Sequence, residues 1–348
     1  MWDSFIEAVT KVNDWVNGVV WGLPMIIMIL GTGILLTVRT KVLQVRKFGE
    51  SMSSTIVPAV KDMKKGKKGR DKNSVSQFEA FSAAISGTVG TGNIIGVTSA
   101  ILTGGPGAVL WMWISAFFGM VTNYSENVLG LYYRKKEKDG SFSGGAFYYI
   151  AYGIKQRWLG MLAAIFCLLA AVGMSGVQTN KITGSYTSVL NNDSVAVKLI
   201  IGGIVAFLAA VVIIGGIKRI GRIASMLVPF MSLLFIAMAF VIIGKNYTAI
   251  PDTFRLIFTS AFSSKAVAGG VGGFAFSQII KKGLARGVFS NEAGLGSSVI
   301  AHSASETREP VKQGLWGIFE VFFDTFVICT LTALVILTTN IGSGAYQN

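Results

Sequence analysis

Eight mainly apolar stretches recur along the chain, separated by polar or charged connections. A helical crossing of a bilayer takes about 20 residues, and most of these stretches reach that length. They predict an all-α fold and a polytopic membrane protein. The expected spans are 18–38, 78–102, 108–131, 158–178, 196–217, 223–244, 267–280 and 315–338.

The first 17 residues show a different pattern, with apolar side chains at helical spacing between polar ones. This predicts an amphipathic helix on the membrane surface. The span that follows has neither a basic segment before it nor a small-residue cleavage site, so we expect it to be retained. The apolar positions of this first helix are Phe5, Ile6, Val9, Val12 and Val16.

Composition supports the membrane assignment. Hydrophobic residues make up 52% of the chain and charged residues 14%, whereas soluble domains carry about a quarter charged residues. A soluble enzyme is therefore excluded. The two cysteines, Cys167 and Cys329, both fall in apolar spans, so a disulfide-stapled secreted domain is excluded as well.

The net charge of +14 follows the expected connections. Of the 31 lysines and arginines, 25 fall in alternate connections, 39–77, 132–157, 218–222 and 281–314. The positive-inside rule places these four segments inside and the N-terminus outside. Topology thus explains the positive charge, and no nucleic-acid partner is predicted.

The second span is rich in glycine. Gly87, Gly90, Gly92 and Gly96 fall within ten residues, and each costs about 1 kcal/mol of helix propensity relative to alanine. One interpretation is close helix packing through the last two glycines. Another is a discontinuous helix whose freed backbone groups bind a substrate and an ion at mid-membrane. A dinucleotide loop is excluded, because Ile95 stands where the third glycine is needed.

The seventh span repeats this pattern, with four glycines between positions 269 and 273. Two interrupted segments in corresponding positions of two halves are the best sequence indication of a transporter binding site. The seventh span comes five spans after the second, and five spans is the length of one inverted repeat. Spans two to six would form the first repeat, and span seven would open the second.

Several motifs resemble those of the alanine or glycine:cation symporters, the sodium:alanine symporter or amino acid carrier protein family of bacteria and archaea. The resemblance extends from about residue 18 to 340. The motifs are 87–93 (GTVGTGN), 104–113 (GGPGAVLWMW), 144–150 (GGAFYYI), 286–294 (RGVFSNEAG) and 324–330 (DTFVICT).

The resemblance implies a LeuT-like inverted-repeat fold in a single membrane transport domain, residues 1–348. A leading helix at 18–38 precedes a first five-helix repeat at 78–244 and a partial second repeat at 267–338. The family pattern continues for about three more helices, so we expect the chain to be C-terminally truncated.

The function implied is sodium-coupled uptake of a small neutral amino acid, alanine or glycine, by alternating access across the cell membrane of a prokaryote. No cofactor is expected beyond the coupling sodium ion. The alternatives are a cation channel, or another ion-coupled solute carrier. A membrane-embedded enzyme is not expected, since the spans hold no histidine base and no metal-binding motif.

The resemblance also assigns site residues in the second span. The substrate carboxylate would lie at the N–H groups of Thr91, Gly92 and Asn93, where the outer half-helix begins. The carbonyls around Thr88 and Val89 would face sodium or the substrate ammonium, together with the Thr88 and Asn93 side-chain oxygens. An equal alternative for the Thr88 hydroxyl is a hydrogen bond to the preceding helical turn.

Three further residues are expected to contact the substrate. Phe276 and Ile280 are spaced to share one helix face and would form the wall around a small side chain. Plain interhelical packing is the alternative for both. Gln178, near the outer end of the fourth span, would hydrogen-bond the substrate or mark the water interface.

Asp324 lies about ten residues into the eighth span, where a carboxylate is costly. We expect it to anchor helices through hydroxyl partners such as Thr325; facing a polar cavity together with Glu320 is the alternative. His302 falls in an inside connection, so no proton relay is visible.

Two more interpretations concern charged residues. Glu126 is expected to pair with Arg134, two turns further on. The segment 290–292 (SNE) resembles the start of a helix, with a cap and an acidic first turn.

Overall fold

The computed structural model describes residues 2–20, 22–65, 75–262 and 270–342. These residues are nearly all helical, which confirms the all-α prediction, and one short hairpin is present. In the first part of the chain the elements are α1 (Trp2–Val20), α2 (Leu23–Arg39), α3 (Leu43–Arg46), α4 (Phe48–Lys65), α5 (Gln77–Thr88), the π-helical η1 (Gly92–Gly96), α6 (Val97–Gly104), α7 (Ala108–Tyr133), β1 (Lys135–Lys136), β2 (Phe142–Ser143) and α8 (Ala146–Gly153).

The strands β1 and β2 pair antiparallel, with Lys135 opposite Ser143. The remaining elements are α9 (Arg157–Val189), α10 (Val195–Ile213), α11 (Gly216–Lys245), the 3-10 helix η2 (Tyr247–Ala249), α12 (Ile250–Ala261), α14 (Gly270–Asn291), α15 (Ser298–Ser303), α16 (Pro310–Val321), the π-helical η3 (Phe322–Cys329) and α17 (Thr330–Gly342).

Among the described residues, five helical segments are long and apolar enough to cross a membrane, and the bent pair formed by Gln77–Thr88 and Gly92–Gly104 makes a sixth. Eight spans were expected. The helix expected at 108–131 is present as α7 but is not among these segments, because it carries Asn123, Glu126 and Asn127, which are buried in the protein. The expected span 267–280 begins outside the described residues.

The first boundary is also corrected. The N-terminal helix continues to Val20, and α2 begins only at Leu23. Proline is favoured in the first turn of a helix, since the N–H group it lacks would be unsatisfied there, and Pro24 takes that place. The five apolar positions of α1 are all exposed, which agrees with a helix that meets lipid or the membrane surface.

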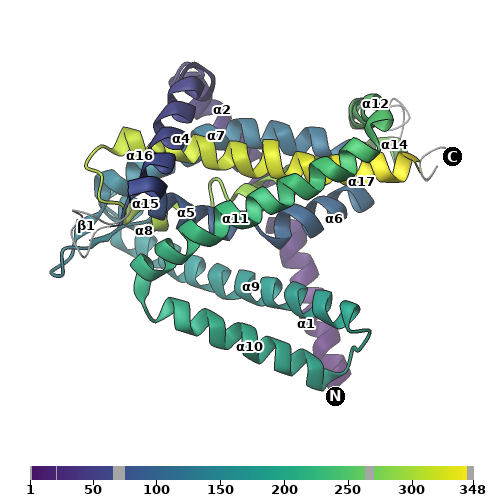
Figure 1. Cartoon of the computed structure of the whole chain (residues 1–348), viewed down its shortest axis with the longest axis horizontal. Helices are drawn as coiled ribbons and strands as arrows, with labels where there is room; N and C mark the ends of the chain where they lie inside the picture. Colours follow the sequence, from purple (N-terminus) through teal and green to yellow (C-terminus); the bar gives the residue numbers. More distant parts are fainter. Residues whose placement is uncertain (1, 21, 66–74, 263–269, 343–348) are drawn as a thin grey trace.

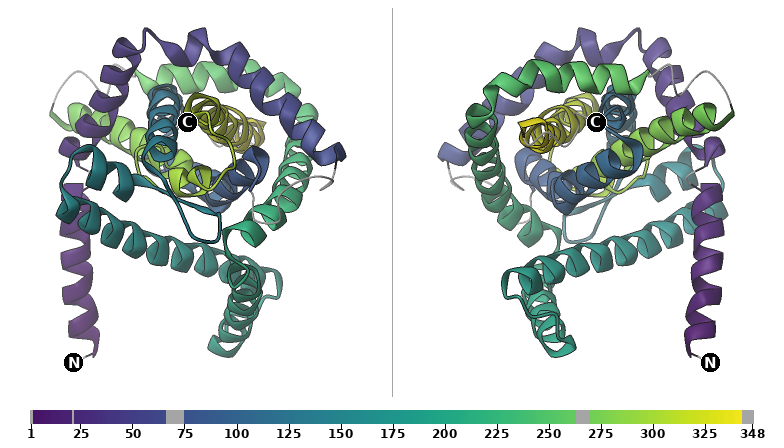
Figure 2. Two further views of the ribbon diagram at one scale, coloured as in Figure 1. Left: turned by 90° about the vertical axis from the view of Figure 1, so that its left-hand side faces the viewer. Right: turned by 90° about the vertical axis from the view of Figure 1, so that its right-hand side faces the viewer.

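A central bundle and a projecting group of helices make up the molecule (Figures 1 and 2). In Figure 2 the C-terminal helix α17 lies near the middle of the view, with other helices around it. The hairpin of α9 and α10 extends below the bundle in Figure 1. None of the 18 most apolar consecutive residues of α10 is buried within the protein. Lipid is therefore the natural environment of this helix.

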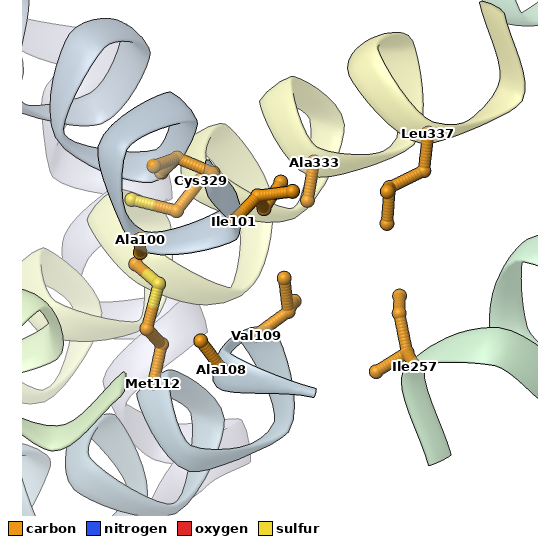
Figure 3. Close-up of a cluster of buried hydrophobic side chains, with 10 residues drawn as sticks. Ala100, Ile101, Ala108, Val109, Met112, Ile257, Cys329, Ala333 and Leu337 are labelled. Carbon is orange, nitrogen blue, oxygen red and sulfur yellow. The ribbon is translucent and has the colours of Figure 1, made fainter. Parts of the chain in front are cut away.

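One core cluster is formed where α6, α7, α12, the end of η3 and α17 meet (Figure 3). Small and medium-sized apolar side chains from these five elements pack together there. Trp113 of α7, packed against this cluster, donates a hydrogen bond of 2.8 Å to the Thr330 hydroxyl at the start of α17. The buried members are Val97, Ala100, Ile101, Ala108, Val109, Met112, Ile257, Cys329, Ala333 and Leu337.

Helices α7 and α16 approach each other closely through glycine. A Cβ atom added at Gly317 would lie 2.4 Å from Oδ1 of Asn123 and 2.5 Å from Nδ2 of Asn127. One at Gly314 would lie 2.7 Å from a methyl group of Val128. These glycines therefore set how near α16, which leads into the polar residues of η3, lies to α7.

We expect Gly317→Ala to lower the free energy of unfolding by about 1–3 kcal/mol, because the added methyl group overpacks this contact. Thermal unfolding in detergent, followed by circular dichroism, measures the change. The control is Gly184→Ala in α9, where no atom lies within 4 Å of the added Cβ. Equal melting temperatures for the two variants would contradict the close approach of the helices.

Candidate functional site

The expected interruption of the second span is confirmed. Helix α5 begins with a capping box between Ser76 and Glu79 and ends at Thr88, after which Val89 is extended. The chain resumes in the π-helical turn η1, and the two halves are bent by 44°. Nothing lies within 4 Å of a Cβ added at Gly92 or Gly96, so close helix packing does not explain these two glycines.

Asn93 bridges the interruption to the rest of the bundle. Its side chain is fully buried, and its Oδ1 accepts a hydrogen bond of 2.8 Å from the Gly90 N–H. Its Nδ2 donates to Oδ1 of Asp324 at 2.6 Å and to the Ser290 hydroxyl at 3.1 Å. One amide therefore connects η1 with two elements about 200 residues further along the chain.

The second interruption lies elsewhere than predicted. Helix α14 continues without a break from Gly270 to Asn291, so the glycines before position 274 do not interrupt it within the described residues. The chain breaks after Asn291, where Glu292, Gly294 and Gly296 have φ values of 53°, 89° and 75°. Left-handed residues of this kind end a helix. The prediction that residues 290–292 begin a helix is therefore wrong, because α14 ends in this segment.

The position of the inside connection 281–314 is corrected as well. A Cβ at Gly104, at the end of α6, would lie 3.0 Å from the Lys282 side chain. At the other end of the bundle, the N–H of Glu306 donates to the Val75 carbonyl, just before α5. The segment between them therefore runs from one end of the bundle to the other, through the second half of α14, the break and α15.

The third irregular segment is the π-helical η3, which carries Asp324. This carboxylate is fully buried. Its Oδ2 accepts hydrogen bonds from the Ser290 hydroxyl at 2.8 Å and the Thr325 hydroxyl at 2.9 Å, and its Oδ1 accepts from Asn93. The Cys329 thiol lies 3.2 Å from the Ser290 hydroxyl. The expected anchoring of helices by Asp324 through hydroxyl groups agrees with this geometry.

All hydrogen-bond partners of Asp324 in the described part of the chain are neutral. A buried carboxylate without a positive partner is strongly destabilising, because hydrogen bonds offset only part of the lost hydration. The site therefore favours a positive species near Asp324, and the oxygens gathered there are the ligands that hard cations prefer.

The structure brings some of the other predicted residues to the first break. The Thr91 hydroxyl donates to the Gln178 amide oxygen, and the Gln178 amide lies 3.7 Å from where a Cβ of Gly90 would be. Gln178 lies inside the 33-residue α9 and not near the end of a span, which corrects its predicted position. The Thr88 hydroxyl donates to the Ile85 carbonyl at 3.3 Å, the alternative considered for it.

The two residues expected to form the pocket wall are not brought to this point. Ile280 lies ten residues before Ser290 in α14, which is about 15 Å along the helix axis. The side chain of Phe276 lies outside the described residues. Their role as a pocket wall stays a prediction, and the structure offers other neighbours of the break, above all Gln178.

Glu126 and Arg134 do not pair with each other. The Glu126 carboxylate accepts a hydrogen bond of 2.9 Å from the Gly294 N–H, inside the second break. Arg134 donates instead to backbone carbonyls of the segment 303–307, and its guanidinium lies 3.8 Å from the Phe142 ring centroid. Sequence spacing suggested a pair, but unpaired backbone groups in irregular segments compete successfully for both charges.

Two contacts in this region were not predicted from the sequence. The link between Asn93 and Asp324 joins distant residues, and only the cost of a carboxylate within a span indicated it. His302, expected in a polar connection, is fully buried in α15 and lies 2.9 Å from Glu320. The apolar and small residues on both sides of His302 were the available indication of its burial.

Comparison with known proteins agrees with these features. Residues 6–348 match the model of the sodium:alanine symporter family. The uncharacterized transporter YflA of Bacillus subtilis is 36% identical over 98% of this chain and 70% of its own length. The sodium/alanine symporter AgcS of Methanococcus maripaludis is 40% identical, covering 95% of this chain and 71% of the relative. The probable sodium/glutamine symporter GlnT of Bacillus subtilis is 38% identical, covering 92% of this chain and 64% of the relative.

The expected family is therefore confirmed, and with it the prediction of a multi-pass membrane transporter and not an enzyme. The family match agrees with the interrupted helices and the buried polar groups between them. This chain belongs to the sodium:alanine symporter family, whose relatives are ion-coupled carriers of amino acids.

Proposed function

We propose that the protein takes up a small neutral amino acid, alanine or glycine, together with sodium by alternating access. The proposal includes a LeuT-like arrangement of inverted repeats, in the cell membrane of a prokaryote with the N-terminus outside. The name of one relative specifies alanine and that of another glutamine, so the small substrate is inferred from the sequence motifs and not from the family alone.

The observation that carries the proposal is the buried Asp324 carboxylate between three irregular helical segments. It lies beside Asn93 of η1 and Ser290 at the end of α14, and its own helix is π-helical there. Sodium binds to oxygen atoms, preferably with at least one carboxylate to compensate its charge. A sodium ion held here would contact groups from both halves of the chain, so its binding would favour the arrangement that brings them together.

In this proposal, the substrate binds next to the cation site. The N–H groups of Thr91 and Gly92 begin the outer half of the broken helix, where an amino-acid carboxylate is favoured. Carbonyls at Thr88 and Val89 end the inner half and suit the substrate ammonium or the sodium ion. Gln178 of α9, which contacts Thr91, adds an amide that can select a short side chain by closing the space beside Gly90.

In the full-length carrier, we expect Asn93→Ala to reduce sodium-driven alanine uptake roughly tenfold or more. A hydrogen bond to a charged group contributes about 1.5–3 kcal/mol, and tenfold corresponds to about 1.4 kcal/mol. Uptake of labelled alanine into proteoliposomes with an inward sodium gradient measures this.

The matched control is Asn127→Ala, since Asn127 is equally buried but bonds only to Asn123 on its own helix. We expect this variant to keep its uptake. If Asn93→Ala transports as well as Asn127→Ala, the first break does not contain the site.

A second prediction isolates the charge of Asp324. Ligands that bind only the folded state stabilise it, so sodium should raise the melting temperature of the full-length carrier relative to potassium at equal ionic strength. Asp324→Asn should abolish this difference, because the amide keeps the size of the side chain but loses its charge.

Glu309→Gln is the control for removing a carboxylate, since Glu309 is exposed and pairs with Lys312. A sodium-dependent shift that persists in Asp324→Asn would show that the cation binds elsewhere.

A further inference from the structure

A second buried polar group lies at the Val75 end of the bundle, apart from the proposed transport site. His302 of α15 and Glu320 of α16 are both fully buried, and Nε2 of His302 lies 2.9 Å from Oε2 of Glu320. The Ser298 hydroxyl also donates to this carboxylate, at 2.8 Å. Neither residue has a role in the proposed binding of sodium or amino acid.

The polar contacts continue from His302 to the start of α5. The Gln313 amide nitrogen lies 2.6 Å from Nδ1 of His302, and the Gln77 amide nitrogen donates to the Gln313 oxygen at 3.2 Å. An amide NH2 group can only donate, so Nδ1 must accept. The ring proton is therefore on Nε2, where it is donated to Glu320, and the imidazole is neutral.

This polar chain, Gln77–Gln313–His302–Glu320, ties α5 to α15 and α16. It lies beside the backbone contact between Val75 and the Glu306 N–H, at 2.8 Å. Charged groups lie near it on the neighbouring elements, and all but one are carboxylates. They are Glu79 of α5, Glu126 of α7, Arg134 after α7, Glu292 after α14 and Asp324 of η3.

We propose that His302 and Glu320 form a proton-binding site that controls the attachment of α5 to α15 and α16. A second proton on the ring must sit on Nδ1. There it faces the NH2 group of Gln313, so Gln313 must turn its amide oxygen toward the ring. Its NH2 group then opposes the NH2 group of Gln77, and the contact between Gln77 and Gln313 is lost. Neutral His302 therefore holds this end of the bundle closed, and acidification loosens it. This inference does not depend on which solute the protein carries.

The chain contains a single histidine, which makes the proposal directly testable by nuclear magnetic resonance. With nitrogen-15 labelled histidine in lipid nanodiscs, the ring should show the Nε2–H tautomer at neutral pH. It should become doubly protonated when the pH is lowered. An Nδ1–H tautomer, or a ring that stays neutral throughout, would overturn the assignment.

Backbone hydrogen exchange reports on the closure itself. The exchange rate of the Glu306 amide is measured in the wild-type protein and in Gln313→Glu. The ratio of the wild-type rate to the variant rate should be at least severalfold higher at pH 5.5 than at pH 7.5. In that variant a carboxylate accepts from Nδ1–H, so the protonated ring keeps the contact and acidification no longer loosens it. Comparing the two proteins at the same pH removes the intrinsic effect of pH on exchange.

The control for a new buried carboxylate is Gln44→Glu, because Gln44 is buried in a different place and bonds to Thr37. It should retain the wild-type response to pH. If Glu306 exchange responds to pH identically in wild type and Gln313→Glu, the proposal is wrong. If neither glutamate variant folds, the wild-type protein alone provides the test, with the amide of Thr253, buried in α12, as the reference. A ratio of the Glu306 exchange rate to the Thr253 exchange rate that does not change with pH would refute the proposal.

Discussion

The central constraint of this structure is the Asp324 carboxylate, which is fully buried and has no positive partner among the described residues. Asp324 is held by neutral donors on η1, at the end of α14 and on its own helix. Each donor stabilises the negative charge, but none cancels it. The surrounding helices must therefore be irregular enough to aim their polar groups inward, and a cation bound there, as proposed, would stabilise the buried charge further.

The irregular segments are tolerated because side chains of other elements supply hydrogen-bond partners for them. A freed N–H or carbonyl group facing lipid costs several kcal/mol, so the backbone groups freed at the breaks need such partners. The first break is enclosed by α9, through Gln178, and by the end of α14. The second is satisfied by Glu126, which accepts from Gly294. Close packing of α7 on α16 through Gly317 keeps Glu126 and Asp324 on facing elements.

Much of this arrangement could be predicted from the sequence. Glycine clustering at 87–96 indicated the first break correctly, because there glycine coincides with Asn93 and with hydroxyl residues that can replace backbone partners. The same reasoning does not hold at 270–273, within the described residues. Glycine permits a break but does not require one, and α14 is helical from Gly270 to Asn291.

The true second break depends on Glu292, which adopts a left-handed conformation that side chains rarely take. Composition carries no signal for this. Partners of charged groups were equally hard to predict, since Arg134 and Glu126 each bind backbone atoms of residues more than 160 positions away. Local spacing identifies neighbours on one helix, whereas irregular backbone elsewhere in the fold offered these charges better partners.

Helix α5 connects the two buried polar groups. Its 12 residues span about 18 Å, with Gln77 at one end and Thr88 next to the break at the other. The aromatic packing of Phe81 against Trp316, with ring centroids 4.9 Å apart, also attaches it to α16.

Beyond Thr88 the regular helix stops, so α5 is joined to α6 by extended backbone and by the Asn93 amide. At one end its attachment depends on a neutral imidazole, and at the other on the groups around Asp324. In the proposed carrier, each end of the same rigid segment is therefore controlled by a cation: a proton at His302 and sodium at Asp324. The break at Val89 is what allows the two ends of the second span to respond separately.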